Sequence, residues 1–458
     1  MKILSKLFEL FNDSTFYSKL RRIAIPIIIQ NFIASSLNMV DTMMIGKVGE
    51  TEIACVGIAN QYFFLFNLLI TGFCSGCSMF ISQFWGKKDE KNIKKVLGVG
   101  LIVTVVSGVI FTIIALIIPE KIMLLFNKDP NVIKFGASYL RIVCISYVFT
   151  AITFNFAIAL RCIEKSKIPM IFSMIALMIN TILNYILIFG NFGFKPMGVK
   201  GAAIATLIAR IIETTLILSY VYLKEPILAG RLNEMFCWTK EFANKIIRNI
   251  IPVVLNECCW GTGMVVYSAI YGRIGTKAIA SVQICTTVQN LFMVVGIGMA
   301  NASTVMIGNT IGAGKKEKGK VYAKRFTGLG SILGLSLGII LALSSKNILS
   351  IFKVSDKVLH DSLLILYITA VLMTIRVVNV IIITGVLRGG GDAKYPLIVE
   401  ACTMWLIGVP LAIIGAFVLK LPVYLVVALA TAEEITKFFI GLARLISNKW
   451  IRNLTTSV

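Results

Sequence analysis

The chain alternates long apolar stretches with short polar ones. The first apolar stretch, residues 23–45, is long enough to cross a hydrocarbon core of about 30 Å as a helix. Eleven more stretches of similar character follow it. Together they are residues 23–45, 54–81, 96–118, 137–160, 168–189, 201–223, 246–271, 278–307, 327–344, 363–387, 396–418 and 421–445. The pattern predicts an all-α polytopic membrane protein with twelve transmembrane helices.

The second half of the sequence repeats the first. One constant register, a fixed shift between the two halves, aligns Pro26 with Pro252 and Gly86 with Gly312. A second register, in which that shift is one residue longer, aligns Arg161 with Arg388. Each copy holds six spans, an even number, so both copies have the same orientation. We therefore expect two parallel six-helix lobes related by an axis along the membrane normal, an arrangement found among transporters.

These patterns divide the chain into five segments. They are a cytoplasmic amphipathic segment (1–22), an N-lobe (23–223), a cytoplasmic inter-lobe linker (224–245), a C-lobe (246–445) and a cytoplasmic tail (446–458).

The charge distribution sets the orientation. The net charge is +23, but Lys and Arg stand in short clusters between the spans rather than in one dense basic domain, so we expect no nucleic-acid partner. Alternate interspan segments, counted with both termini, hold 29 Lys and Arg residues against 12 in the other set. The positive-inside rule then places both termini in the cytoplasm of a multi-pass protein of the inner (plasma) membrane.

Two carboxylates inside the spans are the first candidates for function. Asp41 lies near the end of the first span and Glu257 lies well inside the seventh. A charge in such a span costs at least about 2.5–3.5 kcal/mol, so it usually faces a cavity and has a role. Pro26 breaks the hydrogen-bond ladder of the first span and makes bending there cheap. We interpret Asp41 and Glu257 as ion-coupling residues and Pro26 as a hinge; the alternative is that the acids are pinned to nearby donors for folding.

Several motifs resemble those of the multidrug and toxic compound extrusion (MATE) family, in particular its bacterial DinF-like and NorM-like members. The resemblance covers nearly the whole chain after Arg22. It rests on the order and spacing of the motifs Asn38-Met-Val-Asp41, Asn180-Thr-Ile-Leu-Asn184, Gly198-Val-Lys-Gly201, Gly308-Asn-Thr-Ile-Gly312 and Leu387-Arg388-Gly-Gly-Gly-Asp392. It implies a secondary antiporter that exports organic, often cationic or aromatic, compounds in exchange for H⁺ or Na⁺. The coupling ion would be its only cofactor.

The residues of the spans also suggest partners for the two acids. Around Asp41, the side chains of Asn38, Tyr139, Asn180 and Asn184 could supply hydrogen bonds or oxygen ligands. DinF-like members carry a second acid on the fifth span, where this chain has only asparagines.

In the C-lobe, Glu257 resembles the seventh-span glutamate of NorM-like members. The tenth-span acid of those members is missing, and Arg376 lies near the middle of that span instead. An ion pair between Glu257 and Arg376 is therefore plausible, as is one between Arg210 and Glu213 on the sixth span.

Two other functions are weighed against export. A lipid-linked oligosaccharide flippase of the same superfamily would need a strongly cationic cavity, for which few arginines are available. An intramembrane enzyme or a metal site would need a cluster of ligands, and the single histidine, His360, lies outside the spans. We expect no enzyme activity, no bound metal and no obligate protein partner, and small organic molecules and the lipid bilayer as what the protein contacts.

Overall fold

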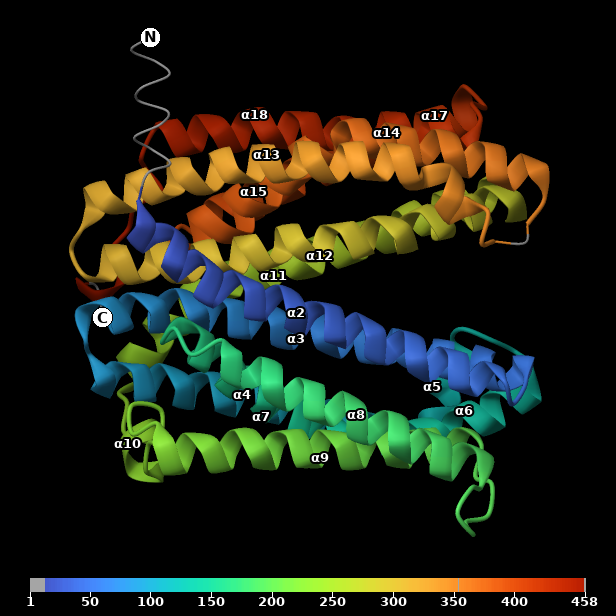
Figure 1. Cartoon of the computed structure of the whole chain (residues 1–458), viewed down its shortest axis with the longest axis horizontal. Helices are drawn as coiled ribbons and strands as arrows, with labels where there is room; N and C mark the ends of the chain where they lie inside the picture. Colours follow the sequence, from blue (N-terminus) through green and yellow to red (C-terminus); the bar gives the residue numbers. More distant parts are fainter. Residues whose placement is uncertain (1–12, 353, 457–458) are drawn as a thin grey trace. The chain divides into compact units, whose positions relative to one another are not determined.

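The structure is a computed structural model. It describes residues 13–352 and 354–456, without the side chains of residues 37, 38, 42 and 50. In this described part the regular elements are helices (Figure 1). Their bounds are α2 (Ser14–Gly46), α3 (Glu50–Lys87), α4 (Glu90–Ile117), α5 (Pro119–Leu124), α6 (Pro130–Val143), α7 (Ser146–Cys162), α8 (Lys167–Phe189), α9 (Val199–Lys224), α10 (Leu232–Phe236), α11 (Lys240–Ile274), α12 (Thr276–Gly312), α13 (Lys316–Leu349), α14 (Asp356–Val380), α15 (Lys394–Thr403), α16 (Val409–Ile413), α17 (Val423–Ala430) and α18 (Ala432–Ile446). π-helical turns extend α14 to Leu387 and join α15 and α16 into one segment that reaches Val418.

Ten of these helical segments are long and apolar enough to cross a membrane as single spans. The predicted fourth span is the pair α6 and α7, bent by 48° at a short break. The predicted twelfth span is the pair α17 and α18, which meet at Thr431. The first span starts earlier than predicted: α2 is continuous from Ser14, so residues 14–22 extend it, while residues 1–12 lie outside the described part.

The helices cluster in two compact units. Unit 1 comprises the chain up to Ile28, Ser82–Lys88 and the chain from Arg248, and unit 2 comprises Ile29–Ile81 and Asp89–Ile247. The chain therefore passes from unit 1 to unit 2 within α2, between Pro26 and Gln30.

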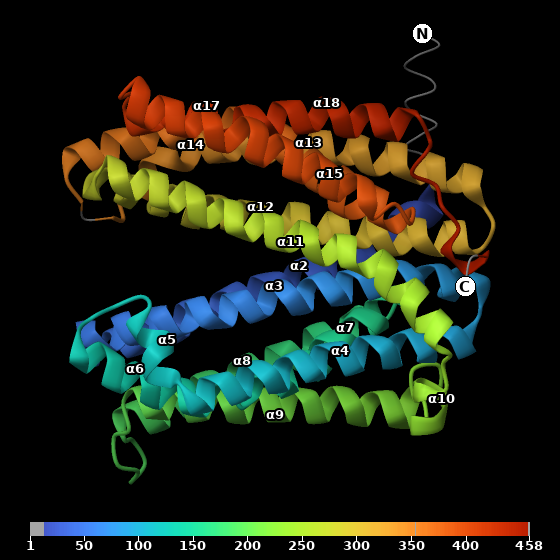
Figure 2. The same ribbon diagram turned by 180° about the vertical axis from the view of Figure 1, so that it is seen from behind.

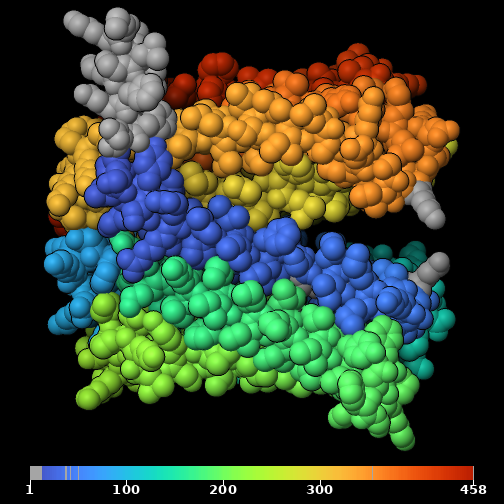
Figure 3. Space-filling model, in the orientation of Figure 1, coloured from blue at the N-terminus to red at the C-terminus, as the bar shows by residue number. Residues whose placement is uncertain are grey.

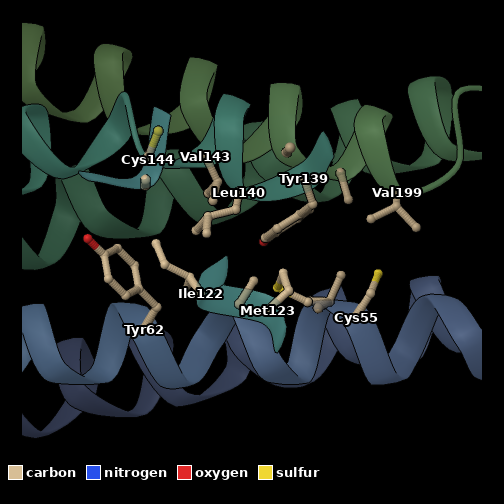
Figure 4. Packing of buried hydrophobic residues seen from close by; sticks show 14 of the residues in the cluster. Cys55, Tyr62, Ile122, Met123, Tyr139, Leu140, Val143, Cys144 and Val199 are labelled. Atoms are coloured by element: carbon tan, nitrogen blue, oxygen red, sulfur yellow. The ribbon is translucent and has the colours of Figure 1, made fainter. Parts of the chain in front are cut away.

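Unit 2 has a core rich in aromatic rings. Phe66 and Tyr147 stack with ring centroids 5.1 Å apart, and Tyr62 donates a hydrogen bond to the Phe111 carbonyl. The short helix α5 inserts Ile122 and Met123 into this core, between α3 and α6 (Figure 4). Helices α8 and α9 lie side by side, and the loop of residues 190–198 that joins them extends beyond their ends (Figure 3).

Unit 1 is built on α12, α13 and α14, with α17 and α18 packed along α14 (Figure 2). Helices α13 and α14 approach closely because Gly338 has no side chain: a Cβ there would lie 2.5 Å from the Ala370 carbonyl oxygen. The start of α2 belongs to this unit, since Phe16 packs on Phe326 and Asp13 pairs with Arg325 at 2.5 Å.

Candidate functional site

Unit 2 contains a pocket at the level of Asp41, with about 540 Å³ of empty space when its open mouth is counted. Helices α2, α3, α6, α7 and α9 contribute side chains to its wall. The lining residues are Asp41, Val56, Ala59, Asn60, Phe63, Tyr139, Val143, Ser146, Tyr147, Thr150, Thr206 and Arg210. The wall therefore combines one acid, one base, aromatic rings and short polar groups.

Asp41 is held by one asparagine of α8, which also binds a second asparagine on the same helix. The Asn184 side chain donates to the Asp41 carboxylate at 2.5 Å and to the Asn180 side-chain oxygen at 3.0 Å. Asn180 in turn donates to the Thr206 hydroxyl at 3.3 Å. Both asparagines are fully buried and lie four residues apart, so one face of α8 presents both amides. The side chain of Asn38 lies outside the described part.

The pocket wall also carries polar atoms that could bind a ligand. Tyr139 faces the pocket from α6, in the same wall as Asp41. Among the described residues, neither the buried Tyr147 hydroxyl nor the Asn184 side-chain oxygen has a hydrogen-bond partner. A bound compound or cation could therefore use the Asp41 carboxylate, the Tyr147 hydroxyl and the Phe63 ring, all of which line the pocket.

A second polar chain starts at the same pocket. Arg210 lines it and pairs with Glu213 one turn further along α9, at 2.9 Å, as the sequence predicts. Ser173 of α8 donates to the other Glu213 oxygen at 2.7 Å. Gln30 of α2 donates to Ser173 at 3.0 Å and accepts from Arg161 at 2.5 Å. This chain of hydrogen bonds connects four helices, and nothing in the sequence signals the contacts of Gln30 or Ser173.

Glu257 has a different partner from the one considered from the sequence. It pairs with Arg388 at 2.7 Å, and the same guanidinium donates to Asn256 at 2.6 Å. Arg376 lies instead in α14, where its charge acts on Tyr271 and Glu434. The prediction of a Glu257–Arg376 pair was therefore wrong: the arginine that follows the tenth span is closer than the one in its middle.

Unit 1 holds a buried charged cluster that sequence reasoning largely missed. Lys437 of α18 pairs with Glu400 of α15 at 2.9 Å, and Glu433 accepts from the Tyr267 hydroxyl at 2.9 Å. Glu434 accepts from Asn379 at 2.7 Å. A usable signal existed, because Glu400 is a lone carboxylate in an apolar stretch, as Asp41 is.

The repeat relates the two polar regions. In the register that aligns Pro26 with Pro252, Tyr267 occupies the place of Asp41. In the register that aligns Arg161 with Arg388, the equivalent pairs are Thr206 and Glu433, Arg210 and Lys437, and Ser173 and Glu400. Each half thus has a basic residue at the same point of its last span, while its acidic partners stand at different points. Among the described residues, no three His, Cys, Asp or Glu side chains gather as metal ligands.

Comparison with protein families agrees with this duplication. The family model MatE matches the chain twice, over residues 26–186 and over residues 252–414. One match falls in each half, and together they cover more than half of the sequence.

The chain is also similar to individual proteins along most of its length. It is 27% identical to the probable multidrug resistance protein YoeA of Bacillus subtilis. The 404 aligned residues cover 87% of this chain and 87% of that one. It is 23% identical to the probable multidrug resistance protein NorM of Thermotoga maritima, over 86% of this chain and 85% of that one. A solved structure described as MATE in the bent conformation has a TM-score of 0.85 at 19% identity, covering 96% of this chain and 98% of that chain.

Proposed function

Because the chain belongs to the MatE family of multidrug efflux transporters, we propose that it is a secondary active antiporter that exports organic, often cationic or aromatic, compounds in exchange for H⁺ or Na⁺. Family membership, the shared fold and the helix pattern establish a polytopic membrane transporter with twelve helices in two lobes, as the sequence predicts. They do not favour the flippase alternative, since the similar proteins are named for multidrug resistance.

The pocket around Asp41 is the observation that carries this proposal. A carboxylate held by one amide donor, beside aromatic rings and hydroxyls, suits either a cation or the ammonium group of an organic compound. Both ligands need the same carboxylate, so they compete for it. Competition for one site is what couples export of one ligand to import of the other.

In the mechanism that we propose, H⁺ or Na⁺ reaches Asp41 from outside and displaces the compound. The first span then bends at Pro26, the pocket shrinks and the compound leaves outward. The solved relative described as bent supports a fold that admits such a change. Return of the lobes releases the ion inside.

The resemblance gives Glu257 a second coupling role, whereas its ion pair with Arg388 favours a holding role. An experiment in proteoliposomes separates these roles. Efflux of a fluorescent organic cation is measured under separately imposed Na⁺ and H⁺ gradients for wild type, Asp41→Asn and Glu257→Gln. We expect Asp41→Asn to abolish gradient-driven efflux and Glu257→Gln to leave it coupled, and the effective gradient identifies the ion.

The opposite pattern, with Asp41→Asn normal and Glu257→Gln inactive, would place coupling in the C-lobe. Wild-type protein that moves no compound under either gradient would contradict the antiporter proposal itself.

A further inference from the structure

The turn that follows the tenth span has a counterpart with the same backbone in the first half of the chain. The Gly391 amide donates to the Arg388 carbonyl at 2.8 Å, and the equivalent Glu164 amide donates to the Arg161 carbonyl at 3.0 Å. Both turns place this residue in the left-handed region, with a φ of 88° at Gly391 and 65° at Glu164. The backbone of the turn therefore does not require a glycine at the position before it.

That preceding position is filled in opposite ways in the two halves. In the first half it is Ile163, whose side chain is buried, so the turn fills the space by itself. In the second half it is Gly390, and the ring of Trp450 from the tail packs where a side chain would stand. Leu223, the residue that the repeat aligns with Trp450, is exposed at the end of α9. The second turn thus takes a separate segment where the first takes its own side chain.

The tail also holds the end of α3. The Gln83 side chain is fully buried, accepts from the Leu454 amide at 2.7 Å and donates to the Arg452 carbonyl at 3.1 Å. Helix α3 passes from unit 2 into unit 1 between Ile81 and Ser82. The tail therefore binds α3 next to the point where this helix leaves unit 2.

The end of α3 lies directly against the end of α12, which comes from the other half of the chain. A Cβ at Gly312 would collide with the Gln83 carbonyl oxygen, and a Cβ at Gly86 would collide with the Asn309 carbonyl oxygen. The repeat aligns Gly86 with Gly312, so the two helices cross at equivalent glycines. Because the two backbones are in contact there, no organic compound can pass between these helix ends.

Undocking of the tail leaves no buried charge without a partner. Asp392 faces Arg452 at 3.5 Å, but its shorter ion pair, at 2.6 Å, is with Arg444 of α18. Gln83 also donates to the Gly389 carbonyl at 3.3 Å, so its amide keeps a partner without the tail. Removing one partner of a buried ion pair is strongly destabilising, and that penalty does not arise here. The tail is thus bound mainly by apolar packing and amide hydrogen bonds.

We propose that the tail is a removable latch on the crossing of α3 and α12. Docked on Gly390 and Gln83, it holds the two helix ends together and keeps the tail side of the transporter closed. When it undocks, the end of α3 is free to leave unit 1, and that side opens. The charge distribution predicts that this side is cytoplasmic, the side from which an exporter takes its compound. The inference rests on the proposed function for its role in transport, but not for the docking itself.

The variant Gly390→Ile removes the tail from its site without leaving a hole. It gives the second turn the side chain that the first turn has in Ile163, and it leaves the Trp450 ring no room. Lys449→Ala is the matched control in the tail, because Lys449 is exposed. Ile163→Ala is the control in the first half, because it empties the equivalent site far from the tail in sequence.

Hydrogen exchange of the full-length protein tests the docking without a transport assay. In Gly390→Ile we expect residues 82–88 and 452–456 to exchange about tenfold faster or more, because each segment loses the other as a partner. Residues 388–393 should stay as protected as in wild type, since the new side chain fills the space of the indole ring. Neither control variant should change exchange in any of these segments.

Transport in proteoliposomes tests the latch. A larger share of the state that accepts the compound on the tail side raises the apparent affinity for it in proportion. Gly390→Ile should therefore lower the concentration of the fluorescent organic cation that gives half-maximal efflux about threefold or more. Trp450→Ala, which empties the site instead of filling it, should lower this concentration as well, and Lys449→Ala should not. A tail that only stabilised the fold would change the amount of active protein and leave this concentration unchanged.

Two results would overturn the inference. Unchanged exchange at residues 82–88 in both Gly390→Ile and Trp450→Ala would show that the tail does not hold α3. Faster exchange there, with a half-maximal concentration that is unchanged or higher, would show that the tail holds α3 but is no latch. Wild-type protein that transports nothing would contradict the proposed function, and the exchange comparison would still decide whether the tail holds α3.

Discussion

Single side chains of opposite charge stabilise the interior of both units. Arg210 has its acid three residues away on the same helix, whereas Lys437 reaches Glu400 on another helix. Spacing along one helix can be read from a sequence, so the first pair was predictable. The second pair joins residues 37 positions apart and depends on how α15 and α18 pack, which no local pattern encodes.

The same limit applies around Asp41. Composition marks Asp41 and the two asparagines as unusual in apolar stretches, and the structure brings them together. The contacts of Gln30 and Ser173 have no such mark, because uncharged polar residues are common in helices that pack on one another.

Lys437 should be more important for stability than its direct partner. It pairs with Glu400 and also faces Glu433 and Glu434. Lys437→Met would leave the buried carboxylates of Glu400 and Glu433 without their cation, with Arg376 still acting on Glu434, and should lower the free energy of unfolding by about 3–5 kcal/mol. Glu400→Gln leaves Lys437 two other acids and should cost about 1–2 kcal/mol. Thermal unfolding of the purified variants measures both, and equal costs would contradict this ranking.

Helix ends and breaks were harder to predict than the helices themselves. Apolar length located the spans, but the stretch that bends between α6 and α7 contains no proline, and the one proline of the twelfth stretch, Pro422, stands at its start and not at the break at Thr431. At Gly190, by contrast, α8 ends on a left-handed residue with φ 75°, a typical helix stop that the sequence does show.

The start of α2 is a helix end held by charge. Thr15 hydrogen-bonds Asp13, and this contact together with Arg325 of α13 holds the pKa of the Asp13 carboxyl well below its usual range. A carboxyl with a lowered pKa stabilises the fold at every pH above its unfolded value of about 4, and the contribution is lost only as the pH falls further.

Asp13→Asn should therefore lower the free energy of unfolding by about 1–2 kcal/mol, a value reduced by the partial exposure of the pair. The loss should be equal at pH 8 and pH 5, as measured by thermal unfolding at both. Glu317→Gln is the control, because its pair with Lys320 on α13 is exposed and should contribute almost nothing. A cost for Asp13→Asn that disappears by pH 5 would refute the lowered pKa.

At the scale of the whole molecule, the repeat was the most informative feature of the sequence. It predicted two six-helix lobes, and the family model matches once in each half. The chain's division into compact units is not the same as the division into halves, because the start of α2 and residues 82–88 cluster with unit 1. The assignment of these segments to unit 1 depends on contacts between residues far apart in the sequence, which a repeat pattern does not encode.

The C-terminal tail provides contacts of this kind within unit 1. Trp450 is fully buried against Gly390, where a Cβ would lie 2.2 Å from its ring. The Arg452 amide donates to the Gly390 carbonyl at 2.7 Å, and the Leu454 amide donates to the Gln83 side chain at 2.7 Å. The tail thus joins the turn after the tenth span to the end of α3.

Because the tail fills this site, Trp450→Ala should cost about 3–5 kcal/mol of unfolding free energy, and hydrogen exchange at residues 388–393 should become faster. Lys449→Ala, next to it in sequence but exposed, should change neither quantity. The tail packs directly on the two glycines of the turn, since a Cβ at Gly390 would meet the Trp450 ring and a Cβ at Gly391 would meet the Arg452 carbonyl oxygen. If Trp450→Ala unfolds like wild type, the tail is an appendage, and the end of α3 must be held in unit 1 by its contacts with α12 and by the hydrogen bond from Gln83 to the Gly389 carbonyl.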